Sequence, residues 1–393
     1  MTDISSASLP LSGIKVIEFC AVAAGPFCGM LLADMGAELI KVESPSGDAL
    51  RSWPPITNGF SENFASLNRN KKSVVLDLKN PEDQRVAFAL ASTADVVIEN
   101  SRPGVMQRLG LGFDALSEVN PKLVYCSISA YGQSGPREKE GGFDLTIQAA
   151  AGVMSVTGSS DEPVKCGVPV ADFSSGLYAA FAVASALAGV RAGQPGVHID
   201  VPMFGCTLAI GALQTSEFFG TGSSPVKLGS AHPRNAPYQA YQAADGYFAI
   251  AAGNNNLWRA VALAVNRPEL EQDPRFLTVR DRAANQKELK TLLESSFKEA
   301  GVEHWLSVFN QAGVPHSRIN DYATALADEQ VAHMGWVQDI ELPDGTRTRT
   351  FASPLRFDGK SMPIRSNPPA LGAHTEEARR FAANLAASSV TEG

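Results

Sequence analysis

The chain has 393 residues, of which 44 % are hydrophobic and 19 % are charged. This composition is typical of a folded globular protein and excludes a disordered one, and the length is that of roughly two domains. The 33 Lys and Arg residues against 41 Asp and Glu give a net charge of −8, and no Lys/Arg-dense block stands out, so we expect no nucleic-acid partner.

The first half of the chain alternates short β-branched runs with helix-like segments. IKVIEF (14–19) predicts a strand, and AAGPFCGMLLADMG (23–36) predicts the helix that follows it. Further strands are expected at 37–43, 73–78, 95–100, 123–130 and 197–204, and further helices at 82–93 and after Asp172. This alternation predicts an α/β fold, with a Rossmann-like large domain whose mostly parallel sheet has helices on both faces.

The pattern changes after residue 222, where a Gly-, Ser- and Pro-rich stretch predicts a loop or crossover. A hairpin is expected around Asp245-Gly246. Helices at 257–265, 287–297 and 303–313, a strand at 314–320, and a later hairpin and Ala-rich end helix complete the pattern. We therefore expect a large domain over 1–222, completed by 330–393, and a smaller α+β domain over 223–329.

The cysteines indicate the compartment. There are five of them, an odd number without a C-x-x-C pair, and several lie in apolar runs, which favours reduced thiols in the cytoplasm. The opening MTDISSASLPLSG lacks a signal-peptide pattern. The apolar run 177–190, about 14 residues, is too short to span a bilayer, so we expect a buried core helix and no membrane partner.

Several common chemistries lack their motifs. The first strand–helix turn, CAVAAGPFCG, holds only Gly25 and Gly29, so the dinucleotide fingerprint G-x-G-x-x-G is absent. There is no phosphate-binding G-x-x-x-x-G-K-S/T, and YGQSG (131–135) has the wrong spacing for a nucleophile elbow. The six histidines are scattered, so we expect no metal site.

Carboxylate chemistry remains, and Asp172 is its main candidate. It stands between the extended run GVPVA (167–171) and a long Ala-rich helix. One interpretation is a helix N-cap, for which Asp is a preferred residue. The other is a nucleophile, kept ionised by the helix N-terminus and able to attack an activated acyl group. Local physics does not separate these two interpretations.

The chain as a whole resembles the family III (CaiB–BaiF) coenzyme A transferases. The blocks that carry the resemblance occur in the family's order: PLSGIKVIEFCAVAAGPFCGMLLADMGAELIKVESPSGD, NRNKKSVVLDLKNPE, DVVIENSRPGVMQRLGLGFDAL, NPKLVYCSISAYGQSGP and GVPVADFSSG. The last block matches the one that carries the family's nucleophilic aspartate, which implies that Asp172 is catalytic. The resemblance further implies an acyl-CoA and a carboxylic acid as substrates, no additional cofactor, and an intertwined homodimer.

Positions along the CoA can be carried over from the same resemblance. They are Val22, Ala23, Ala24, Lys72, Asn100 and Arg108. Formyl-CoA transferases have Gln where this chain has Ala23, which argues against formyl or oxalyl specificity. Lys72 has the alternative of a surface charge, and Arg108 that of a helix-face cation. Asn100 ends a strand of the parallel sheet, where ligands usually bind.

Phe143 and Asp144 match family positions near the acyl group. Asp144 would orient substrate or cap its own helix. Racemases of the superfamily have His-Asp at this site, the His serving as a base, whereas this chain has Phe143. An α-methylacyl-CoA racemase or epimerase is therefore the alternative to a transferase, and a CoA-binding protein without catalysis is a third possibility.

The loop 228–239 replaces a glycine-rich run of formyl-CoA transferases. It retains Gly229, and it contains His232 and Arg234, which are candidates to bind a second carboxylate on a substrate such as succinate. Contact with a CoA phosphate or with solvent is the alternative. His316 and Arg318 are weaker candidates of the same kind.

Overall fold

The computed structural model describes residues 9–391. The first eight residues, on which the signal-peptide expectation partly rests, lie outside this range. The chain divides into a large unit (residues up to 153, 165–222 and from 329 on) and a small unit (154–164 and 223–328). Residues 154–164, which the sequence assigns to the large domain, belong to the small unit. There the Gly229 N–H donates to the Gly158 carbonyl at 2.9 Å.

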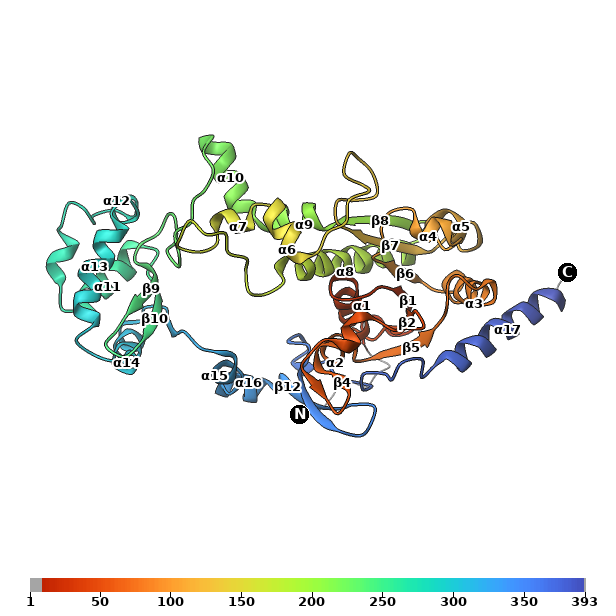
Figure 1. Cartoon of the computed structure of the whole chain (residues 1–393). Helices are drawn as coiled ribbons and strands as arrows, with labels where there is room; N and C mark the ends of the chain where they lie inside the picture. Colours follow the sequence, from red (N-terminus) through yellow and green to blue (C-terminus); the bar gives the residue numbers. More distant parts are fainter. Residues whose placement is uncertain (1–8, 392–393) are drawn as a thin grey trace. The chain divides into compact units, whose positions relative to one another are not determined.

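A six-stranded parallel sheet forms the centre of the large unit (Figure 1). Its strands are β1 (Lys15–Phe19), β2 (Glu38–Glu43), β5 (Lys71–Val75), β6 (Val96–Glu99), β7 (Val124–Ser129) and β8 (Val197–Pro202). They stand in the order β5-β2-β1-β6-β7-β8, the doubly wound arrangement of Rossmann-like folds. The expected α/β architecture is confirmed, although β5 begins two residues earlier than the sequence indicates.

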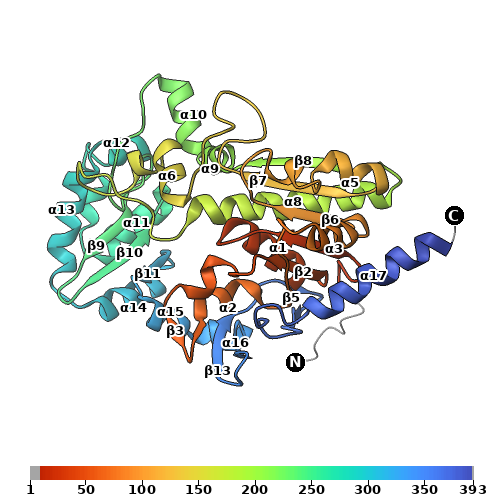
Figure 2. The same ribbon diagram turned by 45° about the vertical axis from the view of Figure 1, so that its right-hand side comes forward.

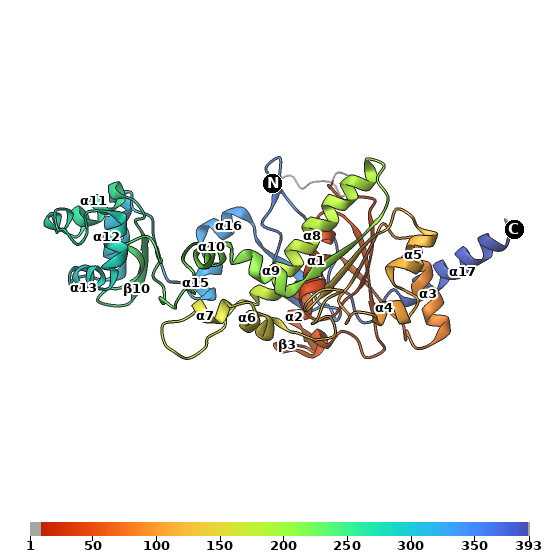
Figure 3. The same ribbon diagram turned by 90° about the horizontal axis from the view of Figure 1, so that it is seen from above.

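Helices cover both faces of this sheet (Figure 3). The helices α1 (Ala24–Asp34) and α8 (Val170–Arg191) pack Leu32 and Val183 against Val16 of one face. On the other face, α3 (Pro81–Ser92), α5 (Phe113–Val119) and α17 (Thr375–Thr391) pack against Ile17 and Tyr125. Because a parallel strand is buried on both sides, its sequence is mostly apolar rather than alternating, as in β6 (VVIE), whereas β1 and β2 also bury charged residues such as Glu18 and Lys41.

Shorter elements connect and extend this layered core. The remaining helices of the large unit are η2 (Ala49–Ser52), α2 (Glu62–Asn68), α4 (Val105–Arg108), α6 (Asp144–Ala150), α9 (Met203–Ile210), α10 (Ala212–Thr221) and α16 (Glu329–Met334). Helix α7 (Val153–Val156) begins at the boundary and lies mostly in the small unit. The remaining strands form three small antiparallel pairs: β3 (Ile56–Thr57) with β4 (Phe60–Ser61), β12 (Val337–Glu341) with β13 (Arg347–Phe351), and β14 (Arg356–Phe357) with β15 (Lys360–Ser361).

The C-terminal segment completes the large unit by covering the edge strand β5. The His374 N–H donates to the Ser73 carbonyl at 2.9 Å, and the Val75 N–H donates to Thr375 Oγ1 at 2.9 Å. A covered edge leaves fewer backbone groups open to pairing with another chain.

The small unit is a three-stranded antiparallel sheet with helices (Figure 2). Its strands are β9 (Tyr238–Gln242), β10 (Tyr247–Ala251) and β11 (His316–Arg318), and its helices are α11 (Asn255–Ala264), η3 (Pro268–Glu271), α12 (Val279–Ala284), α13 (Gln286–Phe297), α14 (Val302–Ala312) and α15 (Tyr322–Leu326). Phe248, Phe297 and Phe309 form the centre of its own hydrophobic core.

Helix α8 differs from the expected buried core helix. Only one stripe of it is buried, with Ala171, Ala179 and Val183 among its members, while Leu177 is 54 % and Phe181 72 % exposed. One helical stripe is all that the neighbouring layer can cover. By length and composition α8 would also suit a membrane span, a test that core helices of soluble proteins pass as well.

Candidate active site

The strand order places a crevice between β1 and β6. From β1 the chain continues to β2 and β5 on one side of the sheet, and from β6 it continues to β7 and β8 on the other side. The boundary between β1 and β6 is therefore the topological switch point, at which α/β proteins bind ligands. Ala21 follows β1 and Asn100 follows β6. The Ala21 N–H donates to Asn100 Oδ1 at 3.0 Å, and Asn100 Nδ2 donates to the Ala21 carbonyl at 2.9 Å. The two strand ends are thereby joined at the crevice.

Two adjoining pockets open at this edge of the sheet. The first, about 270 Å³, is named here the Asp172 pocket, and its lining includes Ala21, Val22, Ala23, Ala24, Asn100, Ser101, Arg102, Glu140, Phe143 and Asp172. The second, about 640 Å³, is named the Arg108 pocket, and its lining includes Ala21, Asp48, Lys79, Asn100, Ser101 and Arg108. The shared residues Ala21, Asn100 and Ser101 form the boundary between them.

Asp172 is the third residue of α8 and not its N-cap, a position that Pro169 holds. The N-cap interpretation from sequence is therefore wrong. The residue before the helix is a proline because its fixed φ suits the entry, and the free amide groups are capped from elsewhere. The Asp172 side chain is half-buried and lines its pocket.

The cap of α8 comes from Asp144, the first residue of α6. Asp144 Oδ1 accepts the Ala171 N–H at 3.0 Å, and Asp144 Oδ2 accepts from Gln148 Nε2 at 2.7 Å. Gln148 is fully buried, and its Oε1 accepts the Cys166 N–H at 2.9 Å. Asp144 thus caps the helix of Asp172 and not its own helix, which was one of the two roles expected from the sequence. The other role, orientation of the substrate, stays a prediction.

Burial raises the pKa of Asp172 to about 7, and the nearby Asp144 carboxylate adds to the increase. The helix N-terminus, which the sequence analysis expects to favour the ionised form of Asp172, acts against these two effects. Loss of hydration and like-charge repulsion outweigh the helix dipole, whose effect is modest in the first turn.

Most of the remaining predicted contacts lie at this edge. Val22, Ala23 and Ala24 line the Asp172 pocket. Phe143, which precedes α6 and is 73 % exposed, also lines it. Arg108 lines the adjoining pocket together with Lys79. Lys79 was missed from the sequence, although it shortly follows β5 and strand ends of this kind commonly face the ligand.

Lys72 does not lie with the other predicted CoA contacts. Its Nζ pairs with Glu38 Oε1 at 3.0 Å and with Glu377 Oε1 at 2.9 Å. It lines a different pocket, between the sheet and α17. Its assignment to CoA is corrected to the alternative of a charge paired on the surface, because its partners come from β2 and the C-terminal helix.

His232 and Arg234 belong to the small unit. His232 Nδ1 accepts the N–H groups of Arg234 and Asn235, each at 3.1 Å, and Gly229 has a φ of +63°. Their contact with substrate stays a prediction, as it does for His316 and Arg318. Within residues 9–391, no group of three or more His, Cys, Asp or Glu side chains is placed to hold a metal ion.

The family model "CoA-transferase family III" matches residues 11–375. The chain belongs to CoA-transferase family III. Succinyl-CoA:glutarate CoA-transferase of Mus musculus is 37 % identical over 93 % of this chain and 85 % of its own length. Succinate–glutarate CoA-transferase of Agrobacterium fabrum is 36 % identical over 95 % of this chain and 96 % of its own.

A crystal structure of a CaiB/BaiF family protein from Brucella suis has a TM-score of 0.84 and 37 % identity, over 95 % of this chain and 99 % of that one. As a family III CoA-transferase, the protein is an enzyme, and its ordered sequence blocks and its sheet agree with that membership. Its site combines a carboxylate with a raised pKa and an adjoining pocket with cationic side chains. Perturbed carboxylates in a cleft are typical of functional sites.

Proposed function

We propose that this enzyme transfers CoA between the thioester of one dicarboxylic acid and another free dicarboxylic acid, with Asp172 as nucleophile. The observation that carries the proposal is the Asp172 carboxylate at the wall of a pocket, on the first turn of α8 and at the switch point of the sheet. Carboxylates of this kind attack activated acyl groups and form covalent intermediates.

Each step exchanges one activated acyl group for another. Asp172 attacks the thioester carbonyl and the C–S bond breaks. CoA is released as the thiolate, and a mixed anhydride of Asp172 and the donor acid is formed. The thiolate then attacks the aspartyl carbonyl, which releases the donor acid and forms an aspartyl-CoA thioester. The acceptor carboxylate attacks that thioester, and the released thiolate takes the new acyl group from Asp172. No net proton is consumed.

The substrate class is supported by the two relatives, whose names pair succinate or its CoA thioester with glutarate. Both acids are dicarboxylic. A cationic group close to the acyl chain would suit the second carboxylate of such a substrate. His232 and Arg234 remain the predicted groups for this contact, and Arg102 lines the Asp172 pocket as a further cation.

Transfer is favoured over racemisation by the residues around Asp172. An α-proton racemase needs a second base opposite its first. Phe143 stands where the racemases have a histidine, and no histidine is among the described residues that line the Asp172 pocket. Glu140 is the other carboxylate that lines this pocket and would be the second base of a racemase. Racemisation would be detected as loss of α-deuterium from the substrate to solvent.

A homodimer is part of the same proposal. Helix α8 leaves large apolar side chains exposed, and α10 adds Leu213 and Phe219, the latter residue being 81 % exposed. Apolar surface of this extent usually marks a protein–protein contact. The proposed partner is a second copy of the chain, as the family resemblance implies.

The function is tested with succinyl-CoA as donor and glutarate as acceptor, followed by mass spectrometry of the CoA products. Asp172→Asn and Asp172→Ala are expected to lose transfer by at least about 10³-fold, since the covalent route is gone. Hydroxylamine added during turnover is expected to modify Asp172 in the unchanged enzyme, detected as a mass shift on its peptide.

Asp114→Asn is the matched control, because Asp114 also lies in the first turn of a helix but is exposed and outside both pockets. It is expected to keep full activity. Retained transfer in Asp172→Ala would show that the mechanism is wrong, and transfer only to monocarboxylic acceptors would overturn the substrate class.

A further inference from the structure

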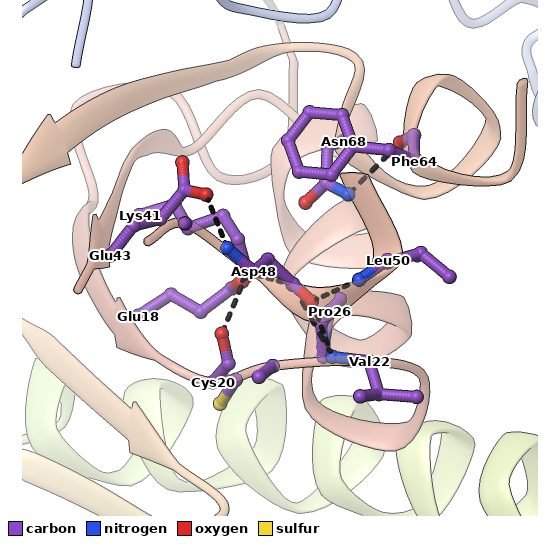
Figure 4. Close-up of polar contacts among 12 residues, drawn as sticks. Glu18, Cys20, Val22, Pro26, Lys41, Glu43, Asp48, Leu50, Phe64 and Asn68 are labelled. Atoms are coloured by element: carbon purple, nitrogen blue, oxygen red, sulfur yellow. Dashed lines mark hydrogen bonds and ion pairs between the residues drawn. The ribbon is translucent and has the colours of Figure 1, made fainter. Parts of the chain in front are cut away.

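The turn after β1 is held by an ion pair next to it (Figure 4). Lys41 Nζ donates to the Cys20 carbonyl at 2.6 Å, and the Val22 N–H donates to the Asp48 carboxylate, at 3.0 Å to Oδ1. Lys41 and Asp48 are themselves paired, with Nζ 2.9 Å from Oδ2. Two backbone groups of one turn are thus bound by the two members of a single ion pair.

Val22 has a backbone conformation that its side chain disfavours. Its φ is +68°, in the left-handed region. For a β-branched residue this conformation costs on the order of 1–2 kcal/mol. Such a residue persists only where surrounding contacts impose it, and it occurs preferentially at functional sites. The backbone N–H of Val22 is bound here to the Asp48 carboxylate.

The ion pair is part of a buried charge network. Glu18 lies between two lysines, with Oε1 3.0 Å from Lys41 Nζ and Oε2 2.8 Å from Lys71 Nζ. The side chains of these three residues are fully buried, and that of Asp48 is 1 % exposed. Within this group of four side chains, the two cations balance the two carboxylates.

A network of this kind is a poor means of adding stability alone. The free-energy cost of removing the charges from water is about as large as the gain from their attraction. Apolar side chains of similar size in the same place often stabilise a protein equally well or better. What the charges provide here is directed hydrogen bonds to two backbone groups of one turn.

We propose that Asp48 is a positioning residue of the active site. Held by Lys41, its carboxylate keeps Val22 left-handed and so sets the wall Ala21–Ala24 that faces Asp172. This inference rests on the proposed function, because it assigns the turn a role in placing the thioester at Asp172.

The turn is placed to affect chemistry because it contacts both pockets. Residues 21–24 line the Asp172 pocket, and Ala21 also lines the Arg108 pocket. A ligand that extends through both pockets would pass this wall. Displacing a reacting group by about 1 Å can lower a rate on the order of 100-fold, even when the change lies away from the chemistry.

The first experiment compares Asp48→Ala with Asp34→Asn. Asp34 forms an equally buried ion pair, 2.6 Å from Arg69, at the far end of α1 and outside both pockets. Assayed well below both melting temperatures, Asp48→Ala is expected to lose about 10- to 100-fold in kcat/KM. Asp34→Asn is expected to stay within about 2-fold of the unchanged enzyme, because a lost ion pair alone does not move the turn.

The second experiment adds Val22→Gly to each background. Glycine adopts positive φ without cost, so it is expected to restore about 5-fold or more of the activity that Asp48→Ala loses. Asp48 also accepts the Leu50 N–H at 2.9 Å and caps η2. A defect in that cap would not respond to a change at Val22, so the rescue is specific to the turn.

Asp48→Asn provides a second variant if Asp48→Ala does not fold. The amide oxygen can still accept the Val22 N–H, and a smaller loss is expected, again reduced by Val22→Gly. Equal effects of Val22→Gly in all backgrounds, or an Asp48 variant as active as Asp34→Asn, overturn the positioning role. Retained transfer in Asp172→Ala would instead overturn the proposed function, so the two failures are distinguishable.

Discussion

At the scale of single residues, two carboxylates on neighbouring helices define the site. Asp144 accepts the Ala171 N–H and therefore caps the helix that presents Asp172. The same carboxylate raises the pKa of Asp172, second to burial. One side chain therefore caps the helix that carries the nucleophile and contributes to the raised pKa of that nucleophile.

The pH dependence of activity follows from this pair. Only ionised Asp172 can attack, so kcat/KM is expected to rise with pH through about 7 and to level off above it. Asp144→Asn keeps an oxygen that can accept from Ala171 but removes the negative charge. Its acidic limb is expected to move to lower pH, because one cause of the raised pKa is lost.

This shift also separates Asp172 from a second buried acid. Burial raises the pKa of Glu99 to about 7 as well, but the carboxylate that adds to the increase there is Asp200 and not Asp144. An acidic limb that stays in place in Asp144→Asn would assign the titration to another group. Asp114→Asn serves as control and should leave the profile unchanged.

At the scale of elements, the close approach of α1 and α8 places Asp172 beside the turn after β1. The approach depends on Gly176, where an added Cβ would lie 2.7 Å from the Ala24 carbonyl oxygen. Gly176 follows Asp172 by one helical turn, and Ala24 belongs to the pocket wall. Packing of the two helices and geometry of the site are therefore coupled.

Gly176→Ala is expected to destabilise the protein by about 1–3 kcal/mol and to lower kcat/KM, because the helices must separate to admit the methyl group. Denaturant titration and transfer assays measure the two effects.

Gly189→Ala in the same helix is the control, since its added Cβ would meet only the flexible end of Gln194. Better helix propensity should leave that variant as stable as the unchanged enzyme or more so. Unchanged stability and activity in Gly176→Ala would contradict the packing argument.

At the scale of the whole molecule, the exposed apolar face of α8 predicts self-association. Sedimentation is expected to give twice the 41.6 kDa of one chain. Phe181→Asp is expected to shift the protein toward the monomer, because a charge in an apolar contact is unfavourable.

Leu263→Asp changes an exposed apolar side chain of α11 in the small unit and serves as control, with the mass expected to stay that of the dimer. A monomeric unchanged enzyme, or a dimer indifferent to Phe181→Asp, would speak against this interface.

The sequence predicted local elements better than it predicted contacts. The first strand and helix, the hairpin at Asp245-Gly246 and the start of a long helix near Asp172 all depend on periodicity and turn residues. Lys72 was misplaced because its partners, Glu38 and Glu377, are far from it in the chain. The exposed side of α8 was missed because apolar composition does not tell which stripe a neighbour covers.

The sequence by itself determined the α/β class, the family, and Asp172 at the start of a helix, since these follow from local pattern and ordered motifs. The tertiary structure alone decided that Asp144 caps α8, that the pKa of Asp172 is raised, and that Asp48 and Lys41 hold the turn at Val22. The physical reason is that burial and hydrogen bonding between distant segments exist only once the chain has folded.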